Sequence, residues 1–115
     1  MNFRYHKNEW WWGHSITIVT EDGNGYVNLQ QEDGIEDEMC ISHLSVLEEH
    51  RRKGIGTALL AEAERIAKNH GMKHVYLSAE KGSFVVDWYK RLGYIKDKYR
   101  NKHLYRLTKN FSKTS

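Results

Sequence analysis

The hydrophobic pattern of this chain changes period near its middle, and that change constrains the fold more than any other feature. Before residue 48, β-branched and alternating apolar residues fall into short runs separated by glycine-bearing turns. These runs predict antiparallel strands over 15–20, 26–30 and 39–47. From Gly56 to His70 the apolar residues recur at helical spacing instead, which predicts an amphipathic helix. A region of strands therefore leads directly into a helix.

The rest of the chain alternates between the two kinds of element. Residues 74–79 are predicted as a strand, 83–92 as a shorter helix, and 94–96 with 103–107 as a final hairpin. The predicted order is β-β-β-α-β-α-β-β, an α/β fold with a mixed central sheet flanked by helices in three layers. A chain of 115 residues is expected to form a single domain over residues 1–115.

The composition excludes several classes of protein. No run approaches the ~18 apolar residues of a membrane-spanning helix, and the N-terminus lacks the apolar core of a secretory signal. Cys40 is the only cysteine, so no internal disulfide and no cysteine-type zinc site is expected. These features predict a cytoplasmic protein without a metal and without a membrane partner.

Charge is divided unevenly along the chain. Residues 1–50 hold two basic and ten acidic residues, whereas residues 51–115 hold sixteen basic and five acidic ones. The division predicts an anionic partner for the second half and a cationic partner, such as an amine, for the first. The alternative is a solvated surface whose charges are unevenly spread.

The junction between strand and helix carries the most specific chemistry. A basic stretch, Arg51-Arg52-Lys53, precedes Gly54-Ile55-Gly56-Thr57 at the predicted start of the helix. A helix N-terminus presents unpaired N–H groups, and glycines allow a phosphate to approach them closely. The junction therefore predicts a phosphate or pyrophosphate site. Neither the nucleotide P-loop spacing nor the third glycine of the dinucleotide fingerprint is present.

The same residues resemble a known family. Arg51-x-x-Gly54-x-Gly56 matches the Arg/Gln-x-x-Gly-x-Gly/Ala signature of the GNAT superfamily of N-acetyltransferases, and Leu44-Ser45-Val46 resembles the strand before it. The segment from Trp88 to Tyr94 resembles the aromatic-Tyr-x-x-x-Gly-aromatic segment of that family. The resemblance covers residues 38–109 and implies an enzyme that uses acetyl-CoA as cosubstrate, with no metal.

The resemblance also implies roles for individual residues. The strand before the junction is splayed from its neighbour in this family, and the pantetheine arm enters the gap. A tyrosine at the position of Tyr89 commonly protonates the departing CoA thiolate, so Tyr89 is the expected general acid. The expected cofactor-binding residues are Leu44, Val46, Arg51, Arg52, Lys53, Gly54, Ile55, Gly56 and Thr57.

The acceptor is expected to be a primary amine, of a small molecule or of a protein, and it must lose a proton before it attacks. Regular alternation places Glu38 on the strand face shared with Val46 and makes it the best candidate base. The same alternation places His43 on the opposite face. A water chain in place of a defined base is the alternative, as is a solvated Glu38.

Two departures from the family pattern affect the site, the first its cofactor contacts and the second its acceptor pocket. Gly82 stands where the family often has a cofactor-contacting asparagine. Only about 14 residues precede the first clear strand, so the chain resembles a member trimmed at its N-terminus. Trp10-Trp11-Trp12 lie in this short segment, where they predict partial core packing with at least one indole left for an interface or an acceptor platform. The acceptor site is then open, or completed by a second subunit in a homodimer.

Two other functions fit parts of the sequence. A CoA-binding module of the same fold that has lost catalysis would explain the missing asparagine and the lack of a clear base. A nucleic-acid-binding domain would explain the basic second half, but its basic residues are scattered as on an ordinary surface. An acetyl-CoA-dependent N-acetyltransferase is the function that the motifs favour.

Overall fold

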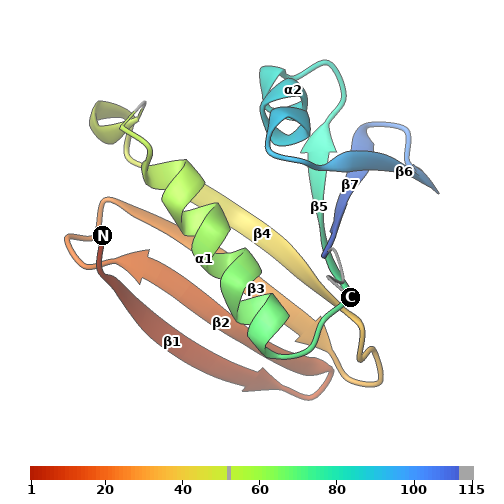
Figure 1. Cartoon of the computed structure of the whole chain (residues 1–115), viewed down its shortest axis with the longest axis horizontal. Helices are drawn as coiled ribbons and strands as arrows, with labels where there is room; N and C mark the ends of the chain where they lie inside the picture. The colour runs from red at the N-terminus through yellow and green to blue at the C-terminus, as the bar shows by residue number, and fades with distance from the viewer. Residues whose placement is uncertain (52, 112–115) are drawn as a thin grey trace.

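The computed structural model describes residues 1–51 and 53–111. Its elements are seven strands, two α-helices and a short 3-10 turn at Glu48–His50. Figure 1 shows how they are arranged. The strands are β1 Phe3–Trp10, β2 Gly13–Thr20, β3 Gly25–Glu32, β4 Glu38–Val46, β5 His74–Glu80, β6 Ile95–Arg100 and β7 Leu104–Asn110, and the helices are α1 Ile55–Asn69 and α2 Phe84–Arg91.

The strands form one mixed sheet in the order β1-β2-β3-β4-β5-β7-β6. Every neighbouring pair is antiparallel except β4 and β5, which are parallel and connected through α1. The predicted α/β fold around a mixed sheet is therefore confirmed. The strand β1 was not predicted, because only Phe3 is shielded from solvent and the rest of this edge strand shows little apolar alternation.

Both helices lie against the same face of the sheet. The core is formed by α1 and the inward residues of the sheet, among them Ile18, Leu29 and Val75, none more than 1% exposed. Tyr94, just after α2, hydrogen-bonds Glu64 in α1, so the two helical segments meet on that side. In the described part of the chain the arrangement has two layers where the sequence predicted three. We call the face without helices the open face.

A β-bulge in β4 changes which residues share a face. Gly25 lies opposite Val46, and Leu29 lies opposite Ile41. Gly25 and Leu29 are four positions apart, but Val46 and Ile41 are five apart, so β4 contains one extra residue. His43 lies in this bulge with a left-handed φ of 55°. The bulge puts Val46 on the helix-covered face with Ile41.

The sequence-based assignment of faces in this strand was therefore wrong. Strict alternation put Glu38, Cys40 and Ser42 on the face of Val46. They lie instead on the open face, where Ser42 is opposite Asn28 and Cys40 is opposite Gln30. One inserted residue reverses the orientation of every residue beyond it, because side chains alternate with a period of two.

The parallel strands β4 and β5 separate along their length. Their pairing is limited to Glu38–His74, Met39–Val75 and Cys40–Tyr76. Beyond Cys40 the two strands diverge, and Figure 1 shows them wide apart at the end where α1 begins and α2 lies. This split agrees with the splayed strand that the family resemblance implied.

The three adjacent tryptophans lie outside the buried core. Trp10 is half exposed, Trp11 is 92% exposed, and the rings of Trp10 and Trp12 stack in parallel with centroids 6.2 Å apart. The indole N–H of Trp10 donates to Ser15 Oγ. The core packing expected for these indoles is limited to this partial cover over the start of β2. No helix in the described residues is long and apolar enough to cross a bilayer.

Candidate active site

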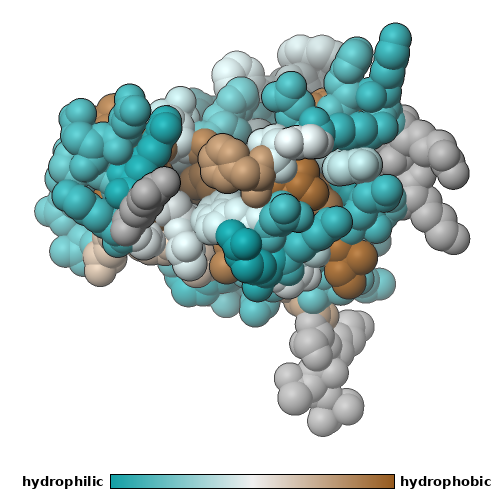
Figure 2. All heavy atoms as spheres, turned by 90° about the horizontal axis from the view of Figure 1, so that it is seen from above, coloured by the Kyte–Doolittle hydropathy of each residue, from teal (hydrophilic) through white to brown (hydrophobic). Residues whose placement is uncertain are grey.

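A cavity of about 600 Å³ lies at the open end of the split between β4 and β5. Figure 2 looks onto this end of the molecule, where apolar side chains are visible at the centre among hydrophilic ones. The walls come from the end of β4, the loop before α1, the first turn of α1, and α2. The lining residues are Leu44, Ser45, Val46, His50, Arg51, Gly54, Ile55, Gly56, Thr57, Phe84, Val85 and Trp88.

The start of α1 gives one wall of the cavity an electropositive character. Gly54 is the N-cap residue with φ 80°, and no side chain caps the helix there. Ala58 N–H donates to Gly54 O, so the N–H groups before it in the first turn have no intrahelical acceptor. These groups and the helix dipole attract an anion.

Gly56 keeps the space between α1 and α2 open. A Cβ atom at this position would lie 3.7 Å from Cη2 of Trp88 and 3.9 Å from Cγ2 of Val46, which is ordinary van der Waals contact. The protein itself would tolerate a methyl group at residue 56, so its absence leaves volume for a ligand rather than relieving a clash.

The unpaired edge of β4 forms the floor of the split. Beyond Cys40 the backbone of β4 has no partner on β5, so its polar groups on that side are available to a ligand. Arg51 Nε donates to Val46 O over 3.1 Å and fixes the loop against the end of the strand. An extended chain with amide groups could pair with this edge as a strand would.

Tyr89 packs beside the cavity rather than in its lining. Its ring centroid lies 4.9 Å from that of Trp88, a lining residue, and 5.7 Å from that of Tyr94. Burial raises the pKa of the Tyr89 phenol above its usual value, so the hydroxyl holds its proton at neutral pH. A protonated phenol next to the cavity is suited to donate a proton.

The structure brings most of the predicted cofactor-binding residues together. Leu44, Val46, Arg51 and the segment from Gly54 to Thr57 all line the one cavity. Lys53 does not line it, and Arg52 lies outside the described residues. The cavity is also lined by residues that the sequence did not predict to bind the cofactor: Ser45, His50, Phe84, Val85 and Trp88. Two of these residues could have been found from their position next to a motif, because Trp88 directly precedes Tyr89 and His50 directly precedes Arg51.

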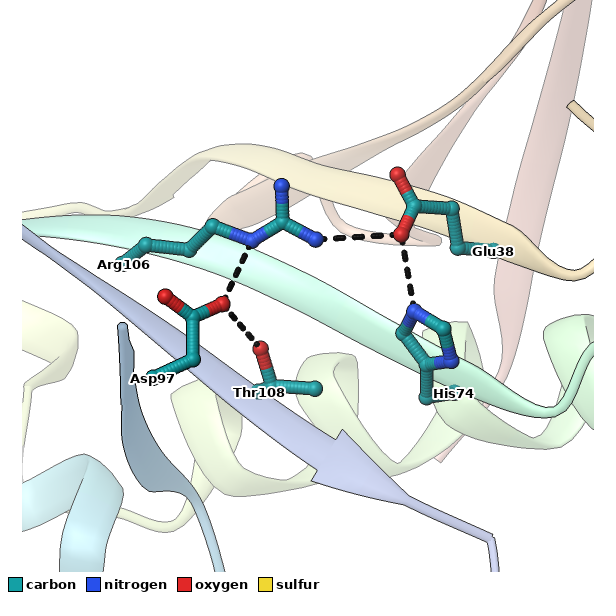
Figure 3. A network of polar contacts seen from close by, with 5 residues as sticks. All are labelled: Glu38, His74, Asp97, Arg106 and Thr108. Carbon is teal, nitrogen blue, oxygen red and sulfur yellow. Dashed lines mark hydrogen bonds and ion pairs between the residues drawn. The ribbon is translucent and has the colours of Figure 1, made fainter. Parts of the chain in front are cut away.

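Glu38 lies at the opposite end of β4 from the cavity. Its Oε1 accepts hydrogen bonds from His74 Nε2 at 2.7 Å and from Arg106 Nη2 at 3.0 Å. Arg106 also pairs with Asp97, whose carboxylate accepts a bond from Thr108, as Figure 3 shows. This network joins four strands where β4 and β5 are still paired. Glu38 and Leu44 are six positions apart, about 20 Å of strand at ~3.3 Å per residue.

No cluster of three or more histidine, cysteine or acidic side chains that could hold a metal occurs in residues 1–51 and 53–111. The polar groups that do converge belong to the ion-pair network on β4–β7 and to the helix N-terminus. The cavity therefore offers backbone N–H groups, a guanidinium and an imidazole, which are ligands for an anion rather than for a cation.

The protein is therefore an α/β protein in which two parallel strands separate and the N-terminus of a helix lies at the separation. Such a cleft suits a ligand that carries phosphate groups. The sequence matches the acetyltransferase (GNAT) family over residues 2–94, and the protein belongs to that family. The resemblance drawn from Arg51-x-x-Gly54-x-Gly56 is thereby confirmed. No match was found among curated proteins.

Solved structures with a similar fold include several acetyltransferases. Nourseothricin acetyltransferase is 20% identical, with a TM-score of 0.67 over 86% of this chain and 65% of its own. PaiA N-acetyltransferase from Thermoplasma acidophilum, solved with coenzyme A, is 21% identical, with a TM-score of 0.70 over 84% and 60%. A GNAT family acetyltransferase from Elizabethkingia anophelis with acetyl-CoA bound is 18% identical, with a TM-score of 0.71 over 87% and 77%.

At these identities the likeness establishes the fold. The chain spans 65% and 60% of the lengths of the first two structures, so it is shorter than they are.

Proposed function

We propose that this protein transfers the acetyl group of acetyl-CoA to a primary amine. One observation carries the proposal: the unpaired edge of β4 and the uncapped N-terminus of α1 open into the same cavity. The edge suits the amide-bearing pantetheine arm, and the helix N-terminus suits the pyrophosphate. CoA combines both chemistries in one molecule.

The cofactor-binding residues divide between these two parts. The backbone N–H groups of the segment from Gly54 to Thr57 would hold the pyrophosphate, with Arg51 and Lys53 adding positive charge and Arg52 assigned on sequence alone. The backbone near Leu44 and Val46 would pair with pantetheine and the thioester. Coenzyme A and acetyl-CoA in two of the similar structures support this choice of ligand.

The chemistry follows from placing the thioester at the end of β4. The neutral amine attacks the carbonyl carbon, a C–N bond forms, and the developing oxyanion accepts a hydrogen bond from a β4 backbone N–H. The attacking nitrogen loses a proton to water, the C–S bond breaks, and the thiolate takes the proton of the Tyr89 phenol, which solvent then replaces. Tyr89 suits this step because burial raises the pKa of its phenol, so the hydroxyl still carries the proton that the departing thiolate needs.

The acceptor is an amine of a small molecule or of a protein. The acidic run at residues 32–38 would attract such a cation, although Glu38 within it is already paired with Arg106. Glu38, the base expected from the sequence, is bonded to His74 and Arg106 at the end of β4 away from the cavity.

Release of free CoA thiol from acetyl-CoA, measured with a panel of polyamines, aminoglycosides and lysine peptides, tests this function. The expected result is amine-dependent release and a product heavier than the amine by one acetyl group. Tight acetyl-CoA binding without release for any amine would contradict transfer and favour the catalytically degenerate CoA-binding module.

A further inference from the structure

Three adjacent tryptophans that the proposed function does not use stand at the tip of the β1–β2 hairpin. Trp10 lies opposite Gly13, so the connection consists of Trp11 and Trp12 alone. Two-residue hairpin turns favour glycine, asparagine and aspartate, because these residues tolerate the backbone conformation that such turns need. None of the three indoles is buried. The tryptophans therefore serve neither the chemistry of the turn nor the core.

The indoles are held in place although they face solvent. The rings of Trp10 and Trp12 stack within 3° of parallel, and the Trp10 N–H donates a 3.3 Å hydrogen bond to Oγ of the buried Ser15. Trp11 beside them is 92% exposed. An ordered aromatic side chain loses little conformational entropy when it binds, and tryptophan is enriched among the residues that dominate the energy of interfaces. The hairpin tip thus has the properties of a binding surface.

An acidic segment, residues 32–37, lies against this hairpin tip. The Asp33 N–H donates to Trp12 O over 2.8 Å, and Gly13 lies opposite Glu32 in the sheet. The approach is so close that a Cβ atom at residue 13 would collide with Gln31 O, so only glycine fits there. The segment carries four exposed carboxylates, those of Glu32, Asp33, Glu36 and Asp37.

These carboxylates keep most of their negative charge. None of them forms an ion pair with the side chains that the structure describes. Lys73, whose backbone N–H donates to Asp37 O, supplies one positive charge against four negative ones. We call the three tryptophans and the four carboxylates together the hairpin-tip surface. It combines exposed indoles with uncompensated negative charge.

We propose that the hairpin-tip surface binds an arginine-rich segment of a partner protein. A flat guanidinium group stacks on the face of an indole, which attracts cations, and it pairs with a carboxylate through two parallel hydrogen bonds. The surface presents both kinds of group side by side, on two neighbouring connections of the sheet. A lysine supplies the charge but neither the planar stacking nor the two-bond pairing, so arginine is the preferred residue.

The hairpin-tip surface lies away from the cavity. Figure 1 shows the β1–β2 and β3–β4 connections at the end of the sheet where α1 ends, whereas the cavity lies where α1 begins. A partner bound to this surface leaves the cavity open. The inference therefore goes beyond the proposed transferase function and does not depend on it.

The charge of the surface disfavours other occupants. A symmetric dimer through this surface would bring the same four carboxylates of two copies together, and like charges repel. Nucleic acids and anionic membranes are repelled by the acidic segment in the same way. Pairing with the basic half of a second copy is the remaining alternative. Such a contact joins two different surfaces, so it yields rings or filaments larger than a dimer.

Fluorescence anisotropy with a labelled peptide of nine arginines tests the proposal on the whole chain. We expect saturable binding of one peptide per chain, several-fold weaker binding of nine lysines, and no binding of nine glutamates. Trp11→Ala should weaken arginine-peptide binding by about tenfold or more. Ile95→Ala removes an apolar side chain that is 67% exposed on β6, at the other edge of the sheet. It is the matched control and should bind as the wild type does.

A pair of double variants tests the contribution of charge. Asp33→Asn with Glu36→Gln should weaken arginine-peptide binding by about tenfold, whereas Glu48→Gln with Glu49→Gln, which removes two exposed charges beside the cavity, should change it less than twofold. Equal losses in the two double variants would overturn the proposal, because they would indicate attraction by net charge alone.

Three other results would also overturn it. The first is an affinity of Trp11→Ala equal to that of Ile95→Ala, and the second is failure of the wild type to bind the arginine peptide. The third is self-association of the wild type into larger species that Trp11→Ala abolishes, measured by light scattering without peptide. That result would assign the surface to a second copy of this chain.

Discussion

The phenol of Tyr94 donates a 2.8 Å hydrogen bond to Oε2 of Glu64, and both residues are buried. The other oxygen of Glu64 accepts a 3.0 Å bond from Lys109 Nζ. The bond therefore ties the segment after α2 to α1. Since the Tyr94 ring also contacts Tyr89 edge to face, this buried pair supports the wall of the cavity that carries the proposed general acid.

Tyr94→Phe should destabilise the protein by about 1–3 kcal/mol, because it leaves one oxygen of a buried carboxylate without its donor. The phenylalanine ring still packs on Tyr89, so kcat should stay close to that of the wild type. Urea unfolding at pH 7 measures the loss, and Tyr26→Phe on the exposed surface is the control. Equal stability of the two variants would show that the buried bond contributes nothing.

Tyr89→Phe should lower kcat by about 10²- to 10⁴-fold while the Kd for acetyl-CoA stays nearly unchanged, since the phenol is needed only when the thiolate departs. Steady-state kinetics and calorimetry on the same preparation separate the two effects. The ring and its contact with Trp88 are retained in this variant. An unaltered kcat would remove Tyr89 from the mechanism.

Gly54→Glu should abolish detectable acetyl-CoA binding, because it puts a carboxylate where the pyrophosphate is expected. Gly23→Glu is a closely matched control: φ is 80° at Gly54 and 78° at Gly23, and neither glycine has a neighbour within 4 Å of an added Cβ. The two variants therefore share backbone strain and charge. Only Gly54→Glu should lose detectable binding, and similar losses in both variants would mean that backbone strain, not the site, is responsible.

Tyr76 should make the folded protein less stable at alkaline pH. Burial, with a smaller contribution from the neighbouring Cys40, raises the pKa of Tyr76 from 10.0 to about 12. Between these values the folded protein binds more protons than the unfolded chain, so the free energy of unfolding falls as the pH rises. The free energy of unfolding should therefore fall less between pH 8 and pH 11 in Tyr76→Phe than in the wild type. The difference should be at most about 1 kcal/mol, after allowance for solvent screening.

Urea unfolding at both pH values tests this prediction. Tyr26→Phe should retain the wild-type fall. A fall that is the same in Tyr76→Phe and in the wild type would show that this phenol titrates alike in the folded and unfolded chains.

The site was predictable from the sequence where its residues are close together in the chain. The strand, the basic loop and the helix start that run from Leu44 to Thr57 form one continuous segment, and its turn chemistry is local. The motif around Tyr89 was recognisable for the same reason. Local signals of this kind predicted most of the lining of the cavity.

Features that depend on pairing between strands were not predictable. The edge strand β1 carries little apolar alternation, and the extra residue at His43 shows no mark in a single sequence. The partners of Glu38 come from positions 74 and 106, which only the sheet order brings to it. Without the bulge, strict alternation puts Glu38 on the wrong face of the sheet.

Calorimetric titration of the wild-type protein with acetyl-CoA, beside desulfo-CoA and ATP, tests the central claim most directly. That claim is that the split between β4 and β5 and the N-terminus of α1 form one binding site for the whole cofactor. The account predicts one site per chain, with similar affinity for acetyl-CoA and desulfo-CoA and much weaker binding of ATP, which lacks pantetheine. ATP binding as tight as acetyl-CoA binding, or no binding of either CoA ligand, would contradict it.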